Sequence, residues 1–155
     1  MSGEAALRVL IADDNADIRR LVRIKLELAG GFEVLPDAVD GAGAVQLADT
    51  HLPDVILLDL SMPVMDGLEA LPLLRQVLPY GRIIMLSGFD SARFRGRALE
   101  LGADEYVEKG GSLDALVGLI RELGTPSIPP RVPEPRQEVP ATADEVEPAE
   151  ASGAA

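Results

Sequence analysis

The chain contains no cysteine and a single histidine, His51. Without thiols it cannot form a disulfide, a zinc-thiolate site or a thiol nucleophile, and one imidazole leaves almost nothing for a histidine-based metal cluster. Any chemistry must therefore depend on carboxylates, hydroxyls and lysine.

Long apolar runs and basic residues are also scarce. No apolar run approaches the roughly 18 to 20 residues needed to cross a bilayer, and residues 1–7 lack the basic and apolar segments of a signal peptide. Lys and Arg number 14 against 26 Asp and Glu, so the formal net charge is −12. Nonspecific nucleic-acid binding is driven by contacts of Lys and Arg with phosphates, so a chain with this net charge is not expected to bind nucleic acid directly. Together with the lack of a membrane-spanning run and a signal peptide, this predicts a cytoplasmic protein that does not insert into a membrane.

The composition changes after Gly124. The segment 125–155 holds seven of the twelve prolines, several acidic residues and no aromatic residue. Low hydrophobicity with frequent proline leaves the entropy of ordering uncompensated, which predicts a disordered, Pro-rich acidic tail. Residues 1–124 are expected to form one folded domain, since the 47% hydrophobic fraction is sufficient for a packed core of that size.

Within this domain, short apolar runs alternate with amphipathic stretches. Runs without polar interruption are typical of parallel strands buried on both faces, and they occupy residues 9–12, 55–58 and 83–86. Residues 32–35 and 105–107 are weaker strand segments. Helical spacing fills the gaps, and the clearest stripe consists of Leu113, Leu116, Val117 and Ile120.

Residues that typically begin or end helices agree with this division of the chain. Ser112 is placed to cap the last helix and Gly124 to end it, while Pro72 marks the first turn of its helix or kinks it. Five strands alternating with five helices predict an α/β domain with a doubly wound parallel sheet, in which ligands bind beyond the carboxyl ends of the strands.

Polar residues follow the predicted strands at that edge. Asp13 and Asp14 come directly after the first uninterrupted run, Asp59 ends the second, Ser87 ends the third, and Lys109 lies just past the last strand. Each has an ordinary explanation by itself, as a helix cap, a turn residue or a solvated charge. Their joint placement favours a site instead.

Three carboxylates held about 5 Å apart repel one another by about 3 kcal/mol per pair at an effective dielectric of about 20. Protonation or cations must offset this repulsion, and Lys109 with a divalent ion would do so. Oxygen ligands of this kind suit Mg²⁺, held by Asp13 and Asp14. With Lys109 and the Ser87 hydroxyl beside phosphoryl oxygens, the set predicts phosphoryl transfer to Asp59 as nucleophile.

These residues resemble the signature of bacterial response regulator receiver domains over roughly residues 5–123. The resemblance includes the order and spacing of Asp13-Asp14, Ser87-Gly88, Lys109 and the segment Leu58-Asp59-Leu60-Ser61-Met62-Pro63-Val64-Met65-Asp66-Gly67. It implies a flavodoxin-like five-stranded sheet in the order 2-1-3-4-5. It also implies a two-component signalling switch that is no enzyme beyond its own phosphorylation and dephosphorylation.

The resemblance further implies partners and residue roles. A sensor histidine kinase or phosphotransfer protein would phosphorylate Asp59, and a downstream protein effector would read the result, without a DNA-binding output domain. The metal, Mg²⁺ or Mn²⁺, would be bound by Asp13, Asp14, Asp59 and the backbone carbonyl of Ser61. Ser87 and Tyr106 would form the switch, Tyr106 being otherwise a partly buried aromatic of an edge strand.

One position departs from the family pattern. Lys109 is followed by Gly110-Gly111, whereas the family usually has a proline there, often after a cis peptide. A cis bond before glycine costs about 3 kcal/mol, so we expect this loop to be trans or mobile. The departure supports an alternative, a constitutive interaction module of the same fold.

A second alternative is a metal-dependent aspartyl phosphotransferase or phosphatase. It would need a further acid or base near Asp59, and position 61 is Ser. The stretch 93–97 carries three arginines, which belong either to a partner-facing surface or to a solvated helix face.

Overall fold

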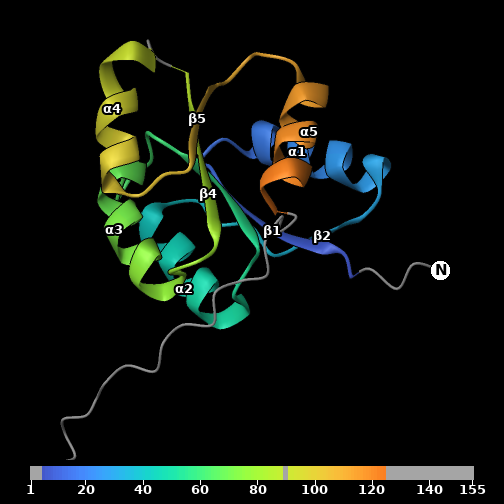
Figure 1. The fold of residues 1–155 in the computed structure, drawn as a ribbon, viewed down its shortest axis with the longest axis horizontal. Helices are drawn as coiled ribbons and strands as arrows, with labels where there is room; N and C mark the ends of the chain where they lie inside the picture. The colour runs from blue at the N-terminus through green and yellow to red at the C-terminus, as the bar shows by residue number, and fades with distance from the viewer. Residues whose placement is uncertain (1–4, 89–90, 125–155) are drawn as a thin grey trace, which may run out of the picture.

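The computed structural model describes residues 5–88 and 91–124. The expected tail, residues 125–155, lies outside them. No helix in the described part of the chain is long and apolar enough to span a bilayer. Strands and helices alternate along these residues (Figure 1), in the order β1 (Leu7–Ala12), α1 (Ala16–Ala29), β2 (Phe32–Val34), α2 (Gly41–His51), β3 (Val55–Asp59), α3 (Gly67–Val77), β4 (Arg82–Ser87), α4 (Ser91–Leu101), β5 (Glu105–Glu108) and α5 (Leu113–Gly124).

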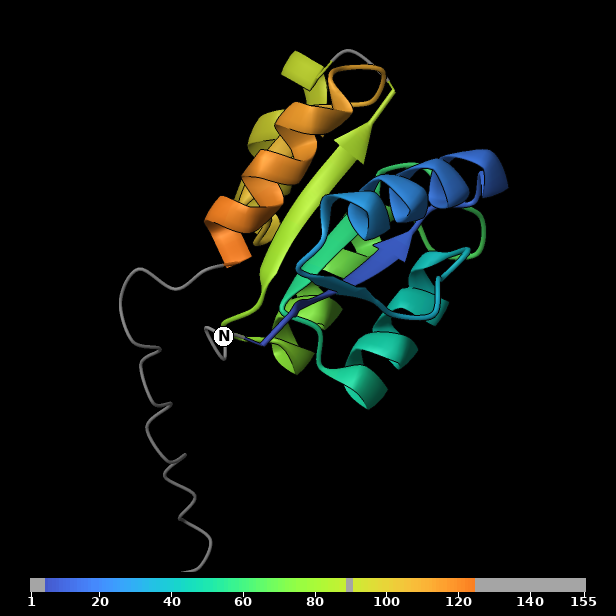
Figure 2. The same ribbon diagram turned by 90° about the vertical axis from the view of Figure 1, so that its right-hand side faces the viewer.

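The strands form one parallel sheet in the order β2-β1-β3-β4-β5, which confirms the predicted topology. Each strand lies within two residues of its predicted bounds. Because all strands run in the same direction, their carboxyl ends meet at one edge of the sheet, as the arrows in Figure 2 show. This edge is where an open α/β sheet places its ligands.

Helices cover both faces of the sheet, and two apolar clusters result. Residues on one face, including Leu57, pack with α1 and α5, while those on the other, including Leu58, pack with α2, α3 and α4 (Figure 1). Both leucines are fully buried. Burial on both faces explains why the central strands are uninterrupted apolar runs and not alternating ones.

The helix ends are fixed by side-chain caps. Asn15 accepts hydrogen bonds from the first turn of α1, and the Ser112 hydroxyl accepts one from Ala115 N–H at 3.1 Å, as predicted for α5. Helix α3 begins at Gly67, after a capping box made by Asp66 and Glu69. Pro72 therefore lies inside α3, and the expectation that it marks the first turn is wrong.

Candidate acidic site

The structure brings the predicted site residues to the carboxyl edge of four strands. Asp13 directly follows β1, Asp59 and Ser87 are the last residues of β3 and β4, and Lys109 directly follows β5. The register aligns them, because Asp59 pairs with Leu86 and Ser87 pairs with Glu108. Segments separated by up to 96 positions of sequence thereby meet at one level of the sheet.

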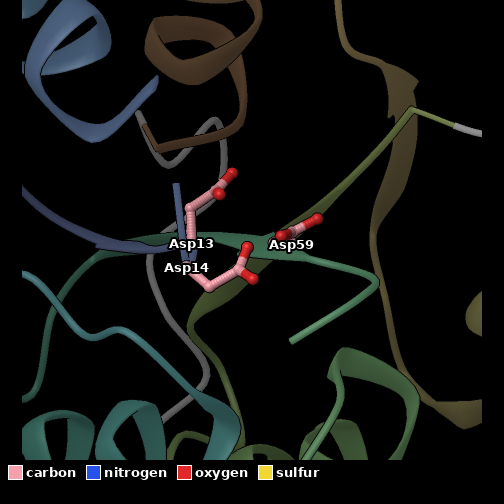
Figure 3. Close-up of side chains that lie close together, drawn as sticks. All are labelled: Asp13, Asp14 and Asp59. Carbon is pink, nitrogen blue, oxygen red and sulfur yellow. The ribbon is translucent and has the colours of Figure 1, made fainter. Parts of the chain in front are cut away.

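The three carboxylates of this edge lie together. One oxygen each from Asp13, Asp14 and Asp59 falls within 4.8 Å of the others. In Figure 3, Asp13 and Asp14 project from the end of one strand beside Asp59 on the next, and the Asp14 carboxylate extends toward Asp59. Asp13 and Asp59 are 1% and 3% exposed, whereas Asp14 is exposed. Two of the three carboxylates are thus buried, and the cluster is open to solvent at Asp14.

Lys109 supplies the positive charge of the site. Its Nζ lies 2.9 Å from Asp13 Oδ2 and 2.9 Å from Asp59 Oδ1, so one ammonium bridges the two buried carboxylates. The Lys109 N–H donates to the Ser87 carbonyl at 2.7 Å, which fixes the lysine backbone on β4. One ammonium against three carboxylates leaves two surplus negative charges.

The burial of Asp59 and the charges around it change its acidity. Burial, with a further contribution from the Asp13 charge, raises the pKa of Asp59 to about 6, although Lys109 and the Ser61 N–H act in the opposite direction. Burial acts to lower the pKa of Lys109, but its contacts with Asp13 and Asp59 outweigh burial and raise it. Lys109 therefore stays charged at neutral pH, while Asp59 is only weakly acidic.

The residues present fit a small divalent cation. The surplus of two negative charges matches such an ion, and its ligands would all be oxygens, the preference of Mg²⁺. Asp13 Oδ2 is buried and, among the described residues, accepts no hydrogen bond, only the ion pair with Lys109. The Ser61 N–H lies 3.4 Å from Asp59 Oδ1. A metal contact from the Ser61 carbonyl remains a prediction.

The loop after Lys109 has the trans peptide expected there. Gly110 has φ +89°, in the left-handed region, whereas proline is confined to about −65°. The chain therefore follows a path here that the family's usual proline could not follow. It nevertheless places the Lys109 ammonium on both buried carboxylates, so the departure does not displace the lysine.

The Asp-Gly turn after the candidate acceptor is sterically required. A Cβ on Gly67 would lie 2.3 Å from the Asp59 carbonyl oxygen, well inside van der Waals contact. The Gly67 N–H also donates to the Leu60 carbonyl at 2.9 Å. Only glycine allows α3 to begin this close to the end of β3.

The two predicted switch residues lie on neighbouring strands. Ser87 is fully buried at the end of β4, and Tyr106 on β5 is 4% exposed. Tyr106 packs in the apolar cluster that contains Ala98 of α4, and Arg95 of α4 donates to the Tyr106 carbonyl at 3.2 Å. Within the described residues, the Tyr106 hydroxyl has no hydrogen-bond partner. Tyr106 is therefore turned inward under α4.

Sequence reasoning missed two residues that contact Asp13 and a third that contacts one of them. The Asn15 N–H donates to Asp13 Oδ1 at 2.9 Å, and Arg19 Nη1 donates to the Asp13 carbonyl at 2.7 Å. Arg19 in turn pairs with Asp37. A signal was present in the sequence, because Arg19 lies in the first turn of α1, where the helix dipole disfavours a cation. The sequence thus indicates a compensating contact for this arginine but not the group that provides it.

The sequence matches the model of the response regulator receiver domain over residues 9–121. That span covers most of the chain and includes every residue of the acidic site. The chain belongs to the response regulator receiver domain family. Residues 9–121 are thereby a receiver domain of two-component signalling.

Individual relatives agree with this assignment. The chain is 35% identical to the chemotaxis protein CheY of Bacillus subtilis over 117 residues, 76% of this chain and 97% of CheY. It is 43% identical to a protein-glutamate methylesterase/protein-glutamine glutaminase of Caulobacter vibrioides over 140 residues, 83% of this chain and 40% of that protein. Several relatives are longer proteins, of which this chain spans about half or less.

Solved structures show the same fold. The signal receiver domain of the putative response regulator NarL from Mycobacterium tuberculosis superposes with a TM-score of 0.74 at 34% identity, covering 78% of this chain and 98% of that domain. The response regulator domain of Thermotoga maritima CheB superposes with a TM-score of 0.71 at 31% identity, covering 77% of this chain and 96% of that domain. The receiver fold thus accounts for the described residues almost completely.

Proposed function

We propose that this receiver domain is a phosphorylation switch that accepts a phosphoryl group on Asp59. The observation that supports this most strongly is the contact of one lysine with two buried carboxylates at the carboxyl edge of the sheet. In the reaction, an Asp59 oxygen forms a bond to phosphorus while the bond from phosphorus to the donor's histidine nitrogen breaks. A sensor histidine kinase or a phosphotransfer protein would supply that group.

The residues of the site have separate tasks in this proposal. Asp59 is the nucleophile, and with a pKa of about 6 it is mostly ionised at neutral pH. Lys109 exchanges part of its contact with Asp59 for a phosphoryl oxygen, and the Ser87 hydroxyl would donate to another. Asp13, Asp14, Asp59 and the Ser61 carbonyl would hold Mg²⁺ or Mn²⁺. The ion, when bound, would neutralise the surplus charge of the carboxylates and phosphoryl oxygens.

Phosphorylation would act on the surface through Ser87 and Tyr106. The new group adds about −1.5 to −2 charge and three acceptor oxygens, which would draw Ser87 and the loop behind it toward Asp59. Tyr106, packed under α4, would report this change on the α4 side of the domain. The exposed arginines of α4, Arg93, Arg95 and Arg97, lie on this surface and would contact a downstream protein effector.

The phosphodonor protein would dock on the other side, over α1 and α5. A cavity of about 470 Å³ lies between these helices and reaches the Lys109–Ser112 loop. Beside it α1 exposes Leu21, Ile24 and Leu28 at 53%, 45% and 80%. An apolar surface on the helix that follows Asp13 and Asp14 suits a helical protein that delivers its phosphohistidine to Asp59. Leu21→Glu should slow transfer from a protein donor while leaving labelling by acetyl phosphate intact.

We further propose that the folded domain extends over residues 1–124 and that 125–155 adds nothing to its packing. Gly124 ends α5 against the core, because a Cβ there would lie 3.0 Å from both Leu7 and Val55. Removal of 125–155 should leave the melting temperature unchanged. A large drop would show that the segment packs on the domain.

The experiment that tests the switch locates the phosphoryl group. The protein is incubated with acetyl phosphate and Mg²⁺, then reduced with borohydride, which converts an acyl phosphate into an alcohol and leaves homoserine. Homoserine at position 59 supports the proposal. Absence of any acyl phosphate would favour the constitutive interaction module, and steady turnover of small phosphate esters would favour the aspartyl phosphotransferase.

A further inference from the structure

The peptides on both sides of Asp13 are held by hydrogen bonds, the one that joins Asp13 to Asp14 by Arg19. The Asp13 N–H donates to the Ala38 carbonyl at 3.0 Å, and the Asp13 carbonyl accepts from Arg19 Nη1 at 2.7 Å. The dihedrals on either side of this peptide, ψ of Asp13 and φ of Asp14, relate the Asp13 side chain to the Asp14 side chain. Holding its carbonyl restrains the peptide plane and so limits how the two carboxylates can be presented relative to each other.

Arg19 is itself paired with a carboxylate, through an ion pair and not a hydrogen bond. Its Nε lies 3.3 Å from Asp37 Oδ2, and its side chain is only 17% exposed. Asp37 also pairs through Oδ1 with Arg23, whose Nη2 donates to the Leu35 carbonyl at 2.8 Å. Asp37 thus ties two arginines of α1 to the segment that follows β2. Of the two, only Arg19 reaches the acidic site.

Asp14 contrasts with Asp13. Asp13 is 1% exposed, and its side chain is held by the Asn15 N–H and by Lys109. Asp14 is exposed, and no hydrogen bond or ion pair of its side chain is seen with another described residue. Its place in the acidic cluster therefore depends on the backbone and on its own side-chain torsions. A contact that restrains the Asp13–Asp14 peptide helps to keep the Asp14 carboxylate beside Asp59.

We propose that Arg19, held by Asp37, is a positioning residue for metal binding by the acidic site. Arg19 contacts neither the ion nor the phosphoryl group; it presets the Asp13–Asp14 peptide so that both carboxylates are in place before a cation arrives. Preorganisation of this kind raises affinity, because the ordering of the ligands does not have to be achieved during binding.

If Arg19 acted through its charge alone, replacing it would change the Mg²⁺ affinity in the opposite direction, which makes the proposal testable. Arg19 is a cation near a site that binds a cation, so removing its charge should strengthen Mg²⁺ binding if charge were its only effect. Loss of positioning should weaken binding instead. Contacts that orient metal ligands are typically worth about 10-fold to 100-fold in affinity.

The test compares Arg19→Gln with Arg23→Gln, which removes the other arginine on the same carboxylate of Asp37. Mg²⁺ affinity is measured by amide chemical-shift titration of the unphosphorylated protein, and stability by thermal unfolding in EDTA. We expect Arg19→Gln to weaken Mg²⁺ binding by about tenfold. We expect Arg23→Gln to lower the melting temperature while its Mg²⁺ affinity stays that of wild type.

Arg19→Lys provides a second variant in case Arg19→Gln does not fold. It keeps the charge but lacks the planar fork that spans the Asp13 carbonyl and Asp37, so it should also bind Mg²⁺ more weakly. Wild-type affinity in a folded Arg19 variant, or equal losses in the Arg19 and Arg23 variants, would overturn the inference. This inference rests on the proposed metal site, and its failure is distinguishable, since a wild-type protein that binds no Mg²⁺ contradicts that site itself.

Discussion

The Nζ of Lys109 lies 2.9 Å from Oδ1 of Asp59, yet this ion pair does not keep Asp59 at its ordinary acidity. Burial and the neighbouring Asp13 charge raise the pKa of Asp59 from 3.8 to about 6 in the metal-free protein. The charged form of Asp59 is therefore less favourable in the fold than in the unfolded chain. An acidic site kept ready for a cation carries this cost until the cation binds.

The first prediction concerns stability against pH in EDTA. Folded Asp59 binds a proton more tightly than unfolded Asp59, so the contribution of Asp59 to wild-type stability should fall as pH rises from about 4 to about 6 and then stay lower. The Asp59→Asn variant has a neutral side chain at position 59 at every pH. It should be more stable than wild type by about 1 to 3 kcal/mol above pH 6, with the difference vanishing near pH 4.

Urea denaturation of the two proteins at a series of pH values measures this difference. Asp54→Asn is a suitable control, because Asp54 precedes β3 at its opposite end and accepts a hydrogen bond from the Arg8 N–H. Its replacement should not stabilise the protein. Wild type and Asp59→Asn curves that run parallel from pH 4 to pH 8 would contradict the account of the site electrostatics.

A second prediction concerns the loop after Lys109. Gly110 has φ +89°, which proline cannot adopt and alanine adopts at a cost of about 1 to 2 kcal/mol. Stability should therefore decrease from wild type to Gly110→Ala to Gly110→Pro. In Gly110→Pro the loop must rearrange, so Mg²⁺-dependent phosphorylation should slow as Lys109 moves.

Gly111 is the matched control for that series. It has no positive φ, and a Cβ there would meet only the Glu108 carbonyl at 3.7 Å, an ordinary contact. Gly111→Ala should therefore change the free energy of unfolding little. If Gly110→Pro proved as stable as wild type in chemical denaturation, the left-handed path of the loop would be wrong.

A third prediction concerns Val64, in the turn between Asp59 and α3. Val64 has φ +69° and is 82% exposed. The residues on either side of it are joined by a hydrogen bond, which the Met65 N–H donates to the Pro63 carbonyl at 2.6 Å. A β-branched residue is strained in that region. Val64→Gly should raise the free energy of unfolding by about 0.5 to 1 kcal/mol, the relief of strain exceeding the entropy cost of glycine.

Val39 offers the comparison, since it is 50% exposed and does not have positive φ. Val39→Gly should lower stability by about 0.5 to 1 kcal/mol, because it introduces flexibility without relieving strain. Equal losses in both variants, measured by urea denaturation, would show that Val64 is not strained.

The fold was largely predictable because the central strands are buried on both faces and so appear as uninterrupted apolar runs. Placement of Asp13, Asp59 and Lys109 at one edge followed from their positions after those runs. Pro72 was harder to interpret, because the cap at Asp66 sets the start of α3 and not the proline. Neither the link from Arg19 to Asp13 nor the φ of Val64 could be predicted, since each depends on how a loop closes in three dimensions.

The central claim is tested most directly by intact-mass spectrometry after incubation with acetyl phosphate, with Mg²⁺ or with EDTA. The account predicts a gain of one phosphoryl group in wild type and in Asp54→Asn with Mg²⁺, and no gain in EDTA or in Asp59→Asn. Asp59→Asn should remain folded, because the change is nearly isosteric. Phosphorylation of folded Asp59→Asn to the wild-type extent, or no phosphorylation of wild type with Mg²⁺, would contradict the account.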